Sequence, residues 1–309
     1  MRTFTESDVI SRLKMADVIA AVEAALRDLG AGRAQNLPRR RASSGKSQLH
    51  LMGAADDRLG LLGYKAYATG PGGAKFAVGL FDAATSVPLA SVEADYLGQL
   101  RTGAASGVAT KYLARTESST VGVFGTGKQA RTQLEAITIV RHIQSAFVYS
   151  RSVENRQRFA EEMSDVCGVE VTPVEQPEDA AKADIVITAT TSRTPVLRGE
   201  WLQPGTHLNV VGSNYANKTE VDIETVRRSK VFVDSREACR EEAGDLIAAV
   251  NAGVLRWEDC AEIGAVLNGA VAGRQSAEDI TLFKSVGLAT EDLAAAALLL
   301  DESRQCARD

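Results

Sequence analysis

The stretch from Val121 to Ala130 reads Val-Gly-Val-Phe-Gly-Thr-Gly-Lys-Gln-Ala. A short apolar run enters the glycine-rich turn Gly125-x-Gly127-x-x-Ala130, and a helical pattern follows directly. Gly125 permits the tight turn, Gly127 lets the backbone approach a phosphate, and Ala130 lets the helix pack close to the strand. A second apolar run, Ser145 to Tyr149, follows at the spacing of a strand–helix–strand unit. This pattern predicts a doubly wound parallel sheet that seats a dinucleotide pyrophosphate on a helix N-terminus.

The second apolar run ends at Ser150-Arg151-Ser152, and this ending discriminates between nicotinamide cofactors. Sites specific for NAD usually place Asp or Glu here, to accept hydrogen bonds from the 2′-hydroxyl of the ribose. The chain instead offers two hydroxyls and a guanidinium, which are donors suited to a 2′-phosphate. The segment therefore favours NADP(H), with NAD(H) possible. The alternative is that it is a solvated loop and that the carboxylate is supplied elsewhere.

Length and composition describe an ordinary globular chain. Its 309 residues suffice for two domains, and 45% hydrophobic content supports a core in each. A net charge of −5 argues against nucleic acid or an anionic membrane as the main partner. No apolar stretch approaches the roughly 20 residues of a spanning helix, and the N-terminus lacks a signal-peptide pattern.

Cysteine and histidine usage narrows the function further. Cys167, Cys239, Cys260 and Cys306 are scattered without a CxxC pair, as expected of reduced thiols, and we expect a cytoplasmic protein. The three histidines show no metal-binding spacing, so we expect no metal site.

The first part of the chain reads as a small α+β unit. A helix is expected over residues Asp8 to Leu29, ended by Gly30, and a second helix from Asp95 to Ala114. Between them lie four strand-like runs separated by Gly, Asp and Pro turns: Ser47 to Met52, Leu61 to Ala68, Phe76 to Asp82 and Val87 to Glu93.

Beyond residue 120, strands and helices alternate, which implies a parallel sheet covered on both faces. The expected strands are Val121 to Phe124, Ala146 to Tyr149, Val169 to Pro173, Ile185 to Ala189, His207 to Val211 and Lys230 to Val233, and the expected helices include Gln129 to Val140 and Val153 to Met163. We therefore expect a Rossmann-type domain over residues 117–290, inserted into an α+β substrate and dimerisation domain of residues 1–116 and 291–309. The helix Glu291 to Leu300 would complete that first domain.

At this point the chain resembles, nearly end to end, the ornithine cyclodeaminase and mu-crystallin family. The matching stretches are Leu49-His50-Leu51-Met52, Gly63-Tyr64-Lys65, Leu100 to Ser106, the glycine turn, His207 to Gly212, Lys218-Thr219-Glu220 and Thr281 to Leu288. The resemblance implies a homodimer paired through the first domain, a nicotinamide cofactor in the Rossmann domain, and an α-amino or α-imino acid substrate. The implied cofactor contacts are Gly125, Thr126, Gly127, Lys128, Gln129, Ala130, Ser150, Arg151, Ser152, Thr190, Gly212, Ser285 and Gly287.

Three cations are candidates to bind the substrate carboxylate. Lys65 interrupts an apolar strand, where an ammonium is costly to bury without an anionic partner, and it matches the active-site lysine of the family. Arg101 opens a run of small residues and matches a family arginine that serves the substrate or the cofactor. Arg40, within Pro38-Arg39-Arg40-Arg41, best matches the carboxylate-binding arginine, with a register uncertain by one residue. The alternative readings are an exposed lysine for Lys65 and a solvated basic face for the run Arg39-Arg40-Arg41.

The chain departs from the family at two positions. Ornithine cyclodeaminases carry an aspartate where this sequence has Asn214, and an amide can neither act as a base nor pair an ammonium with a full charge. Gly98 stands where the family commonly has threonine, which would enlarge the pocket or have no effect.

The resemblance and these departures favour an NADP(H)-dependent reductase of cyclic imino acids, or the corresponding amino-acid dehydrogenase, that transfers hydride to a C=N carbon. Lys65, Arg40 and Arg101 would clamp the carboxylate, and Lys65 or water would manage the proton. Two alternatives remain open. One is an ornithine cyclodeaminase that recycles NAD, which would need an acid other than Asn214, and the conceivable ones are Asp95, Asp222 and Glu220. The other is a non-enzymatic small-ligand binding protein of the mu-crystallin type.

Overall fold

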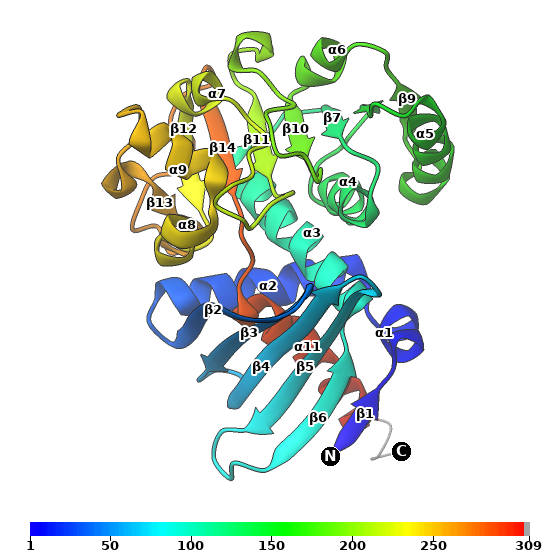
Figure 1. The fold of residues 1–309 in the computed structure, drawn as a ribbon, viewed down its shortest axis with the longest axis vertical. Coiled ribbons are helices and arrows are strands. Elements are labelled where there is room, and N and C mark those ends of the chain that lie inside the picture. The colour runs from blue at the N-terminus through cyan, green and yellow to red at the C-terminus, as the bar shows by residue number, and fades with distance from the viewer. Residues whose placement is uncertain (306–309) are drawn as a thin grey trace. The chain divides into compact units, whose positions relative to one another are not determined.

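The computed structural model describes residues 1–305, which form two compact units (Figure 1). Unit 1 comprises Met1–Arg101 and Gly287–Asp309, and unit 2 comprises Thr102–Val286. The first division falls inside one helix, α3 (Asp95–Leu113). The sequence places the divisions after residues 116 and 290 instead. Cys306 lies outside the described residues.

Unit 1 is built on a six-stranded sheet with the order β1-β6-β5-β4-β3-β2. All neighbouring strands are antiparallel except β1, which is parallel to β6. The strands are β1 (Arg2–Phe4), β2 (Ala34–Ser44), β3 (Ser47–Asp56), β4 (Leu61–Gly70), β5 (Gly73–Asp82) and β6 (Pro88–Glu93), and the other helices of the unit are α1 (Glu6–Arg12), α2 (Met15–Gly30) and α11 (Ala289–Gln305).

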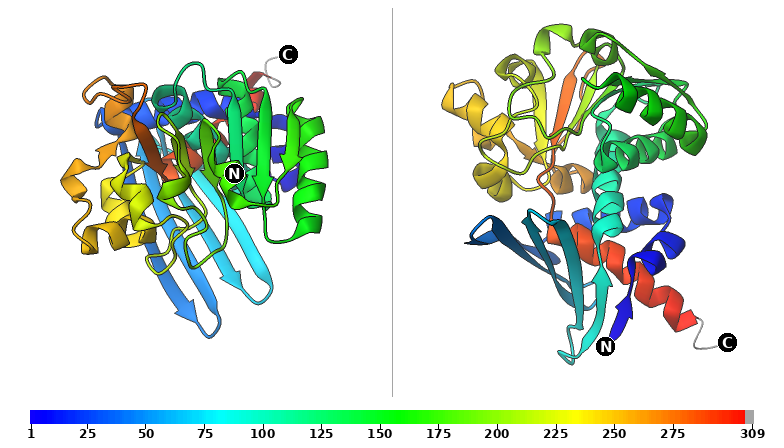
Figure 2. Two further views of the ribbon diagram at one scale, coloured as in Figure 1. Left: turned by 90° about the horizontal axis from the view of Figure 1, so that it is seen from above. Right: turned by 45° about the vertical axis from the view of Figure 1, so that its right-hand side comes forward.

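Helix α11 packs across one face of this sheet, and α2 packs against α11 (Figure 2). Side chains alternate between the faces of a strand, so the paired residues Met52, Lys65 and Val78 share the covered face, and all three are buried. Gly63 lies on the same face, where a β-carbon would come within 2.5 Å of Leu293 on α11. Lys65 is therefore held beneath a helix that comes from the other end of the chain.

The opposite face of the sheet carries large apolar side chains that the chain itself leaves exposed. Leu37, Leu49, Leu51, Leu62 and Tyr64 are between 41% and 62% exposed. An antiparallel sheet commonly leaves one face open to water, but that face is then normally polar. An exposed apolar sheet face of this kind is typical of a surface that binds another protein.

Two elements of unit 1 differ from the sequence expectation. The helix expected over Asp8 to Leu29 is two helices, because Leu13 and Lys14 adopt extended backbone angles between them. A capping box at Thr5 starts the first of them earlier than expected. Strand β2 was not expected, because its residues alternate between exposed and half-buried and it contains Pro38 beside an irregularity in the pairing.

Unit 2 is an eight-stranded sheet in the order β13-β12-β14-β11-β10-β7-β8-β9, and every pairing in it is parallel. The strands are β7 (Thr120–Phe124), β8 (Ser145–Tyr149), β9 (Glu170–Pro173), β10 (Ile185–Thr188), β11 (His207–Val210), β12 (Ser229–Val233), β13 (Ala261–Glu262) and β14 (Ile280–Lys284). The helices are α4 (Lys128–Val140), α5 (Val153–Cys167), α6 (Pro177–Ala181), α7 (Ile223–Arg227), α8 (Arg236–Glu242), α9 (Gly244–Asn251) and α10 (Ile263–Leu267), with 3₁₀ turns η1 (Gly199–Trp201) and η2 (Trp257–Asp259). The predicted fold class is confirmed.

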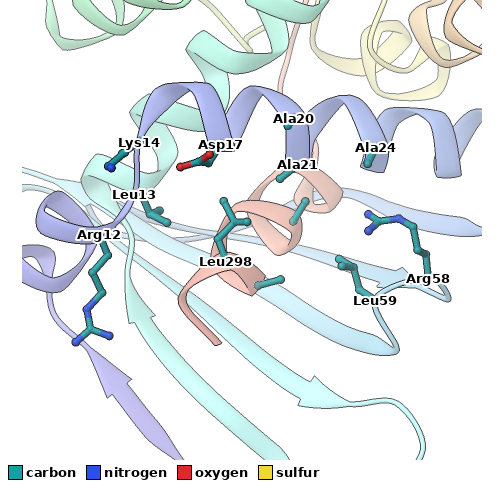
Figure 3. A pocket seen from close by; sticks show the side chains of 12 residues that line it. Arg12, Leu13, Lys14, Asp17, Ala20, Ala21, Ala24, Arg58, Leu59 and Leu298 are labelled. Atoms are coloured by element: carbon teal, nitrogen blue, oxygen red, sulfur yellow. The ribbon is translucent and has the colours of Figure 1, made fainter. Parts of the chain in front are cut away.

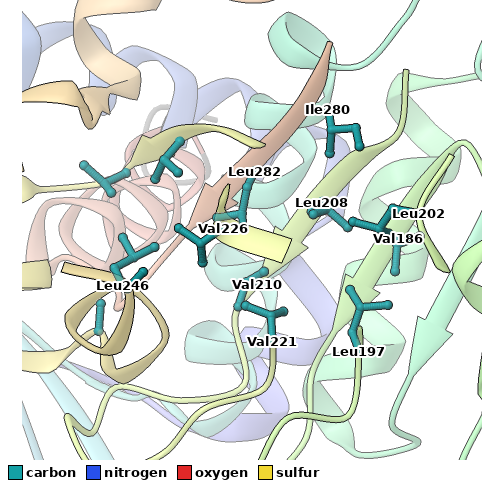
Figure 4. Packing of buried hydrophobic residues seen from close by; sticks show 14 of the residues in the cluster. Val186, Leu197, Leu202, Leu208, Val210, Val221, Val226, Leu246, Ile280 and Leu282 are labelled. Carbon is teal, nitrogen blue, oxygen red and sulfur yellow. The ribbon is translucent and has the colours of Figure 1, made fainter. Parts of the chain in front are cut away.

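Both faces of this parallel sheet are buried. Ile185 and Ile187 point into a cluster built with α4 and α5, whereas Val186 between them points into a second cluster. The second cluster joins the strands to α6 through α9, and Figure 4 shows Leu208, Val210 and Leu282 at its centre. Burial on both sides explains why these strands read as continuous apolar runs.

Within residues 1–305, none of the helices has both the length and the apolar character that crossing a bilayer requires. The same part of the chain contains no group of three or more His, Cys, Asp or Glu side chains that could hold a metal ion.

Candidate active site

The glycine turn adopts the geometry that a phosphate site requires. Gly125 has a φ of +109°, and a β-carbon there would lie 2.5 Å from the Ala189 carbonyl oxygen. Gly127 is the N-cap of α4, and no atom lies within 4 Å of the place its β-carbon would take. No side chain of the described residues caps this helix. The open cradle and the uncapped backbone N–H groups together fit a pyrophosphate.

A groove of about 510 Å³ opens beside this turn, at the carboxyl ends of β7, β8 and β10. It is lined by six of the expected cofactor residues, Gly125, Thr126, Gly127, Ser150, Arg151 and Thr190. Much of the rest of the lining comes from Thr191, Ser192, Thr194, Pro195, Val196, Arg198 and Trp201. In open parallel sheets, ligands bind in the crevice outside the carboxyl ends of the strands. The groove therefore fits a dinucleotide.

The other expected cofactor residues do not line this groove. Lys128 and Gln129 form the first turn of α4, whereas Ala130 is buried in the core behind it. Ser152 caps α5 by accepting the Asn155 N–H at 3.2 Å. The backbone N–H of Gly212 is bound by a carboxylate, the Ser285 hydroxyl donates to Asp234, and Gly287 belongs to unit 1.

The lining of the groove carries positive charge. Arg151 and Arg198 line it, and no lining residue is Asp or Glu. Arg156 donates to the Ser150 carbonyl at 3.1 Å and so holds the end of β8 from the adjacent helix. Of the three donors that the sequence offers at the end of β8, Ser150 and Arg151 line the groove, whereas Ser152 caps α5.

Glu220, which the sequence offered within a family motif and as a conceivable acid for cyclodeamination, holds the wall of the groove in place. Its carboxylate accepts the backbone N–H of Thr190 and of Gly212, each at 2.6 Å, and the Thr190 hydroxyl at 2.8 Å. Its own N–H donates to Asp245, whose carboxylate lies 2.9 Å from the Lys284 ammonium. Burial raises the pKa of Glu220, and the Lys284 charge opposes that rise.

Unit 1 contains a second polar cluster, centred on Lys65. The Lys65 ammonium lies 2.6 Å from Asp292 Oδ1, and Arg101 Nε donates to the same oxygen at 3.1 Å. Arg101 Nη1 also binds Glu291 at 2.7 Å. All four side chains are less than 9% exposed. Sequence reasoning missed both acids. An acidic pair in the first turn of a helix usually faces water, where its negative charge interacts favourably with the helix dipole, so it does not by itself indicate a buried site.

Arg39, and not Arg40, approaches this cluster. Arg40 is exposed, and its strand partner Leu51 belongs to the open apolar face, whereas Arg39 is 5% exposed. The pairing irregularity between Leu37 and Arg40 moves the register by one residue. Burial lowers the pKa of Lys65 to about 8, the Arg101 and Arg39 charges contribute, and Asp292 opposes the shift. Of the arginines that follow Pro38, it is thus Arg39, and not the expected Arg40, that lies buried near Lys65.

Two glycines make room for the cluster. A β-carbon at Gly98 would lie 3.2 Å from the Lys65 ammonium, so a larger residue there would crowd this lysine. Gly287 has a φ of +84°, and its β-carbon would lie 2.6 Å from Arg101 Nη1. The departure at Gly98 therefore leaves space beside Lys65.

Asn214 lies in unit 2, in the loop that follows β11, and is partly buried. The neighbouring carbonyl of Ser213 accepts a hydrogen bond from Lys284 at 3.0 Å. Glu220 and Lys284 therefore hold the two residues that precede this amide, Gly212 and Ser213.

A further pocket of about 410 Å³ lies between α2, α11 and the turn before β4 (Figure 3). Its floor consists mainly of Ala20, Ala21, Ala24 and Leu298. Its charged lining residues are Arg12, Lys14, Asp17 and Arg58, of which Arg12 pairs with Asp8 and Arg58 with Asp28.

The comparisons with known proteins match this geometry. The model of the "Ornithine cyclodeaminase/mu-crystallin family" matches residues 2–306. The structure of the Thermococcus litoralis Δ1-pyrroline-2-carboxylate reductase in complex with NADH and L-proline superposes with a TM-score of 0.95 at 39% identity, covering 99% of this chain and 98% of that one.

Similarity extends to alanine dehydrogenases. The one from Archaeoglobus fulgidus is 36% identical over 307 residues, 97% of this chain and 94% of that protein. An archaeal alanine dehydrogenase dimer with bound NAD superposes with a TM-score of 0.93 at 34% identity, covering 99% of this chain and 96% of that one. The resemblance read from the sequence motifs is confirmed: this chain belongs to the ornithine cyclodeaminase/mu-crystallin family.

Proposed function

We propose that this protein is an NADP(H)-dependent reductase of cyclic α-imino acids, which runs in reverse as an amino-acid dehydrogenase. The observation that carries the proposal is the buried cluster in which Lys65, Arg39 and Arg101 lie with the carboxylates of Glu291 and Asp292. The relatives that reduce Δ1-pyrroline-2-carboxylate and oxidise alanine act on substrates that share an α-carboxylate and a nitrogen on the same carbon.

The cluster is suited to an α-carboxylate because of its charge. Its five side chains comprise three cations and two anions, and this excess of positive charge attracts a carboxylate. A guanidinium offers a planar fork that matches a carboxylate, and a buried ammonium adds a strong point charge. Lys65 and the two arginines therefore bind the carboxylate and orient the C=N carbon.

A nicotinamide cofactor would supply the hydride for this reaction. The open turn at Gly127 and the first turn of α4 would hold its pyrophosphate, and Ser150 and Arg151 would hold the 2′-phosphate. The remaining task of the protein is to position both reactants and to keep water from the reacting carbon.

Lys65 also manages a proton. Its pKa is lowered to about 8, with burial as the main cause, so the ammonium can release a proton near neutral pH. The best pKa for a general acid lies close to the working pH. We therefore assign to Lys65 both carboxylate binding and proton donation.

For the cofactor we favour NADP(H). The structural relatives described above contain NADH or NAD, so a nicotinamide dinucleotide is the common feature. In this chain Arg151 and Arg198 line the groove, and none of its lining residues is a carboxylate that could bind a free 2′-hydroxyl.

Cyclodeamination of ornithine is the second candidate, and Asn214 disfavours it. That reaction needs an acid at this position to handle the distal amine, and an amide cannot supply one. A purely ligand-binding role is disfavoured by Lys65, because burial of an ammonium with a lowered pKa is typical of catalytic sites.

We propose that the protein is a homodimer joined through the open face of the unit 1 sheet. That face carries Leu37, Leu49, Leu51, Leu62 and Tyr64, whose exposure would be costly in a monomer. An archaeal alanine dehydrogenase of the same fold is a dimer. A second copy of the chain is therefore the expected occupant.

We place the protein in the cytoplasm, where thiols stay reduced. Cys167, Cys239 and Cys260 are free thiols. Burial raises the pKa of Cys167 and of Cys260 to about 11, so neither thiol is a reactive thiolate at neutral pH.

The test is a screen of purified protein with NADPH and with NADH against cyclic and acyclic imino acids, together with an ammonia assay on ornithine. The proposal expects oxidation of the reduced cofactor with a cyclic imino acid and no ammonia from ornithine. Lys65→Met should lower kcat/KM by about 100-fold or more while leaving cofactor binding intact. Ammonia and proline formed from ornithine would favour the cyclodeaminase.

A further inference from the structure

The two oxygens of the Asp292 carboxylate have different surroundings. Oδ1 accepts hydrogen bonds from Lys65 at 2.6 Å and from Arg101 at 3.1 Å. Oδ2 is equally buried, and it accepts no hydrogen bond from any residue in the described part of the chain. The side chain as a whole is 1% exposed. Oδ1 thus already accepts two hydrogen bonds, whereas Oδ2 is still able to accept a hydrogen bond from a ligand.

A buried carboxylate oxygen without a donor is costly, and native structures rarely keep one without a reason. A ligand that donates a hydrogen bond to this oxygen would offset the unfavourable free energy, and a positively charged N–H would do so most strongly. Asp292 also lies in direct contact with Lys65 and Arg101, the two cations assigned to the substrate carboxylate. The acceptor and the carboxylate site are therefore neighbours.

We propose that Asp292 is a catalytic residue whose Oδ2 accepts the N–H of the protonated imine. This inference rests on the proposed function and deepens it by assigning the recognition of the substrate nitrogen. In an α-imino acid the nitrogen and the carboxylate are attached to the same carbon. A carboxylate bound by Lys65 and Arg101 consequently brings the nitrogen close to Asp292.

The assignment accounts for the charge on the substrate. Hydride adds to the carbon of C=N–H⁺, the π electrons of that bond move to nitrogen, and a neutral amine forms. The amine then gains one proton, which the Lys65 ammonium gives up and later recovers from solvent. Asp292 remains a carboxylate throughout, because its task is to favour the protonated imine and then the ammonium product.

The charged groups around this pair come from four elements. Asp292 and Glu291 lie on α11, Arg101 on α3, Lys65 on β4, and Arg39 on β2. Glu291 provides a matched control, because it is adjacent in sequence, equally buried and negatively charged, but it forms its ion pair with Arg101, at 2.7 Å, rather than with Lys65. Loss of a negative charge can therefore be separated from loss of the acceptor beside the lysine.

The experiment compares two competitive inhibitors of imine reduction, L-proline and tetrahydrofuran-2-carboxylate. The second keeps the ring and the carboxylate but has oxygen in place of the N–H donor. Both inhibition constants are measured for the wild type, Asp292→Asn and Glu291→Gln. Cofactor binding, followed by fluorescence, verifies that each variant is folded.

We expect the wild type to bind proline at least 10-fold more tightly than the oxygen analogue. Asp292→Asn should weaken proline by roughly 10- to 100-fold and leave the analogue nearly unchanged, as loss of a charged hydrogen bond predicts. Glu291→Gln should keep the wild-type preference. The inference would be overturned if Asp292→Asn weakened the binding of both inhibitors equally. It would also be overturned if the wild type bound proline no more tightly than the oxygen analogue, and this comparison needs no variant. A wild type that reduces no imino acid and binds neither compound would instead reject the proposed function itself.

Discussion

The Glu220 carboxylate accepts the Gly212 backbone N–H at 2.6 Å, with no part of Glu220 exposed to solvent. The same carboxylate binds the backbone of Thr190, so it joins the loops that follow the neighbouring strands β10 and β11. Thr190 lines the dinucleotide groove. A single buried acid therefore sets the spacing of two loops at the carboxyl end of the sheet.

Replacing this acid should loosen the groove. In Glu220→Gln one side of the amide presents donors to a backbone N–H, so at least one of the two hydrogen bonds becomes a clash between donors. We expect cofactor affinity to fall about 10-fold or more and thermal stability to fall with it, measured by cofactor fluorescence and calorimetry. Glu224→Gln, which removes an exposed carboxylate on α7, serves as the control and should change neither quantity.

Two glycines of the same strand–turn–helix unit should respond in opposite ways to alanine. At Gly122 a β-carbon would lie 1.8 Å from the Ala180 carbonyl oxygen, so Gly122→Ala should lower the free energy of unfolding by about 2 kcal/mol or more. At Gly127 the space is open, so Gly127→Ala should leave stability unchanged or slightly higher. Its methyl group should instead obstruct the pyrophosphate and weaken cofactor binding at least 10-fold. Denaturant melts and cofactor titrations test both, and an unstable Gly127→Ala with normal affinity would contradict this reading of the turn.

Arg151 should determine the preference for a 2′-phosphate. Arg151→Ala removes a charged hydrogen bond worth roughly 1.5–3 kcal/mol, so NADPH should bind at least 10-fold more weakly while NADH changes little. Dissociation constants for both cofactors provide the test. Equal weakening of the two would show that Arg151 does not read the 2′-phosphate, and the preference would then have to lie elsewhere in the groove.

His207 predicts a pH dependence of stability. Burial is the main cause that lowers its pKa from 6.5 to about 3, with Arg274 and Arg141 contributing. The unfolded chain takes up this proton below about pH 6.5 and the folded chain does not, so stability is complete above that pH and is lost as the pH falls toward 3. Within this window, the titration of one such group lowers the free energy of unfolding by about 1.4 kcal/mol for each unit by which the pH falls. His207→Gln should flatten the fall measured by urea melts, and replacing the exposed His142 should leave it unchanged.

Sequence reasoning was strongest where a physical signal is local. The strands of unit 2 are buried on both faces and therefore read as apolar runs, and the turn at Gly125 and Gly127 carries a steric requirement that the structure reproduces. Sequence reasoning failed where the contact joins residues that are far apart in the chain. Asp292 lies 227 residues from Lys65, and nothing in the neighbourhood of either residue indicates that they meet.

The arginine near Lys65 illustrates a second kind of failure. Three consecutive arginines follow Pro38, and which of them points inward depends on one irregularity in strand pairing. A shift of one residue reverses the face of every side chain in a strand. Only the paired strands determine that Arg39 is buried and Arg40 exposed.

The most direct test of the central claim is to follow a deuteride. Purified protein is given Δ1-pyrroline-2-carboxylate and NADPH carrying deuterium at the transferable position of the nicotinamide, and the proline formed is analysed by mass spectrometry and NMR. An imine reductase predicts proline with one deuterium on the α-carbon, formed in step with oxidation of the cofactor. Proline without the label, or no proline from the imine together with ammonia released from ornithine, would contradict it.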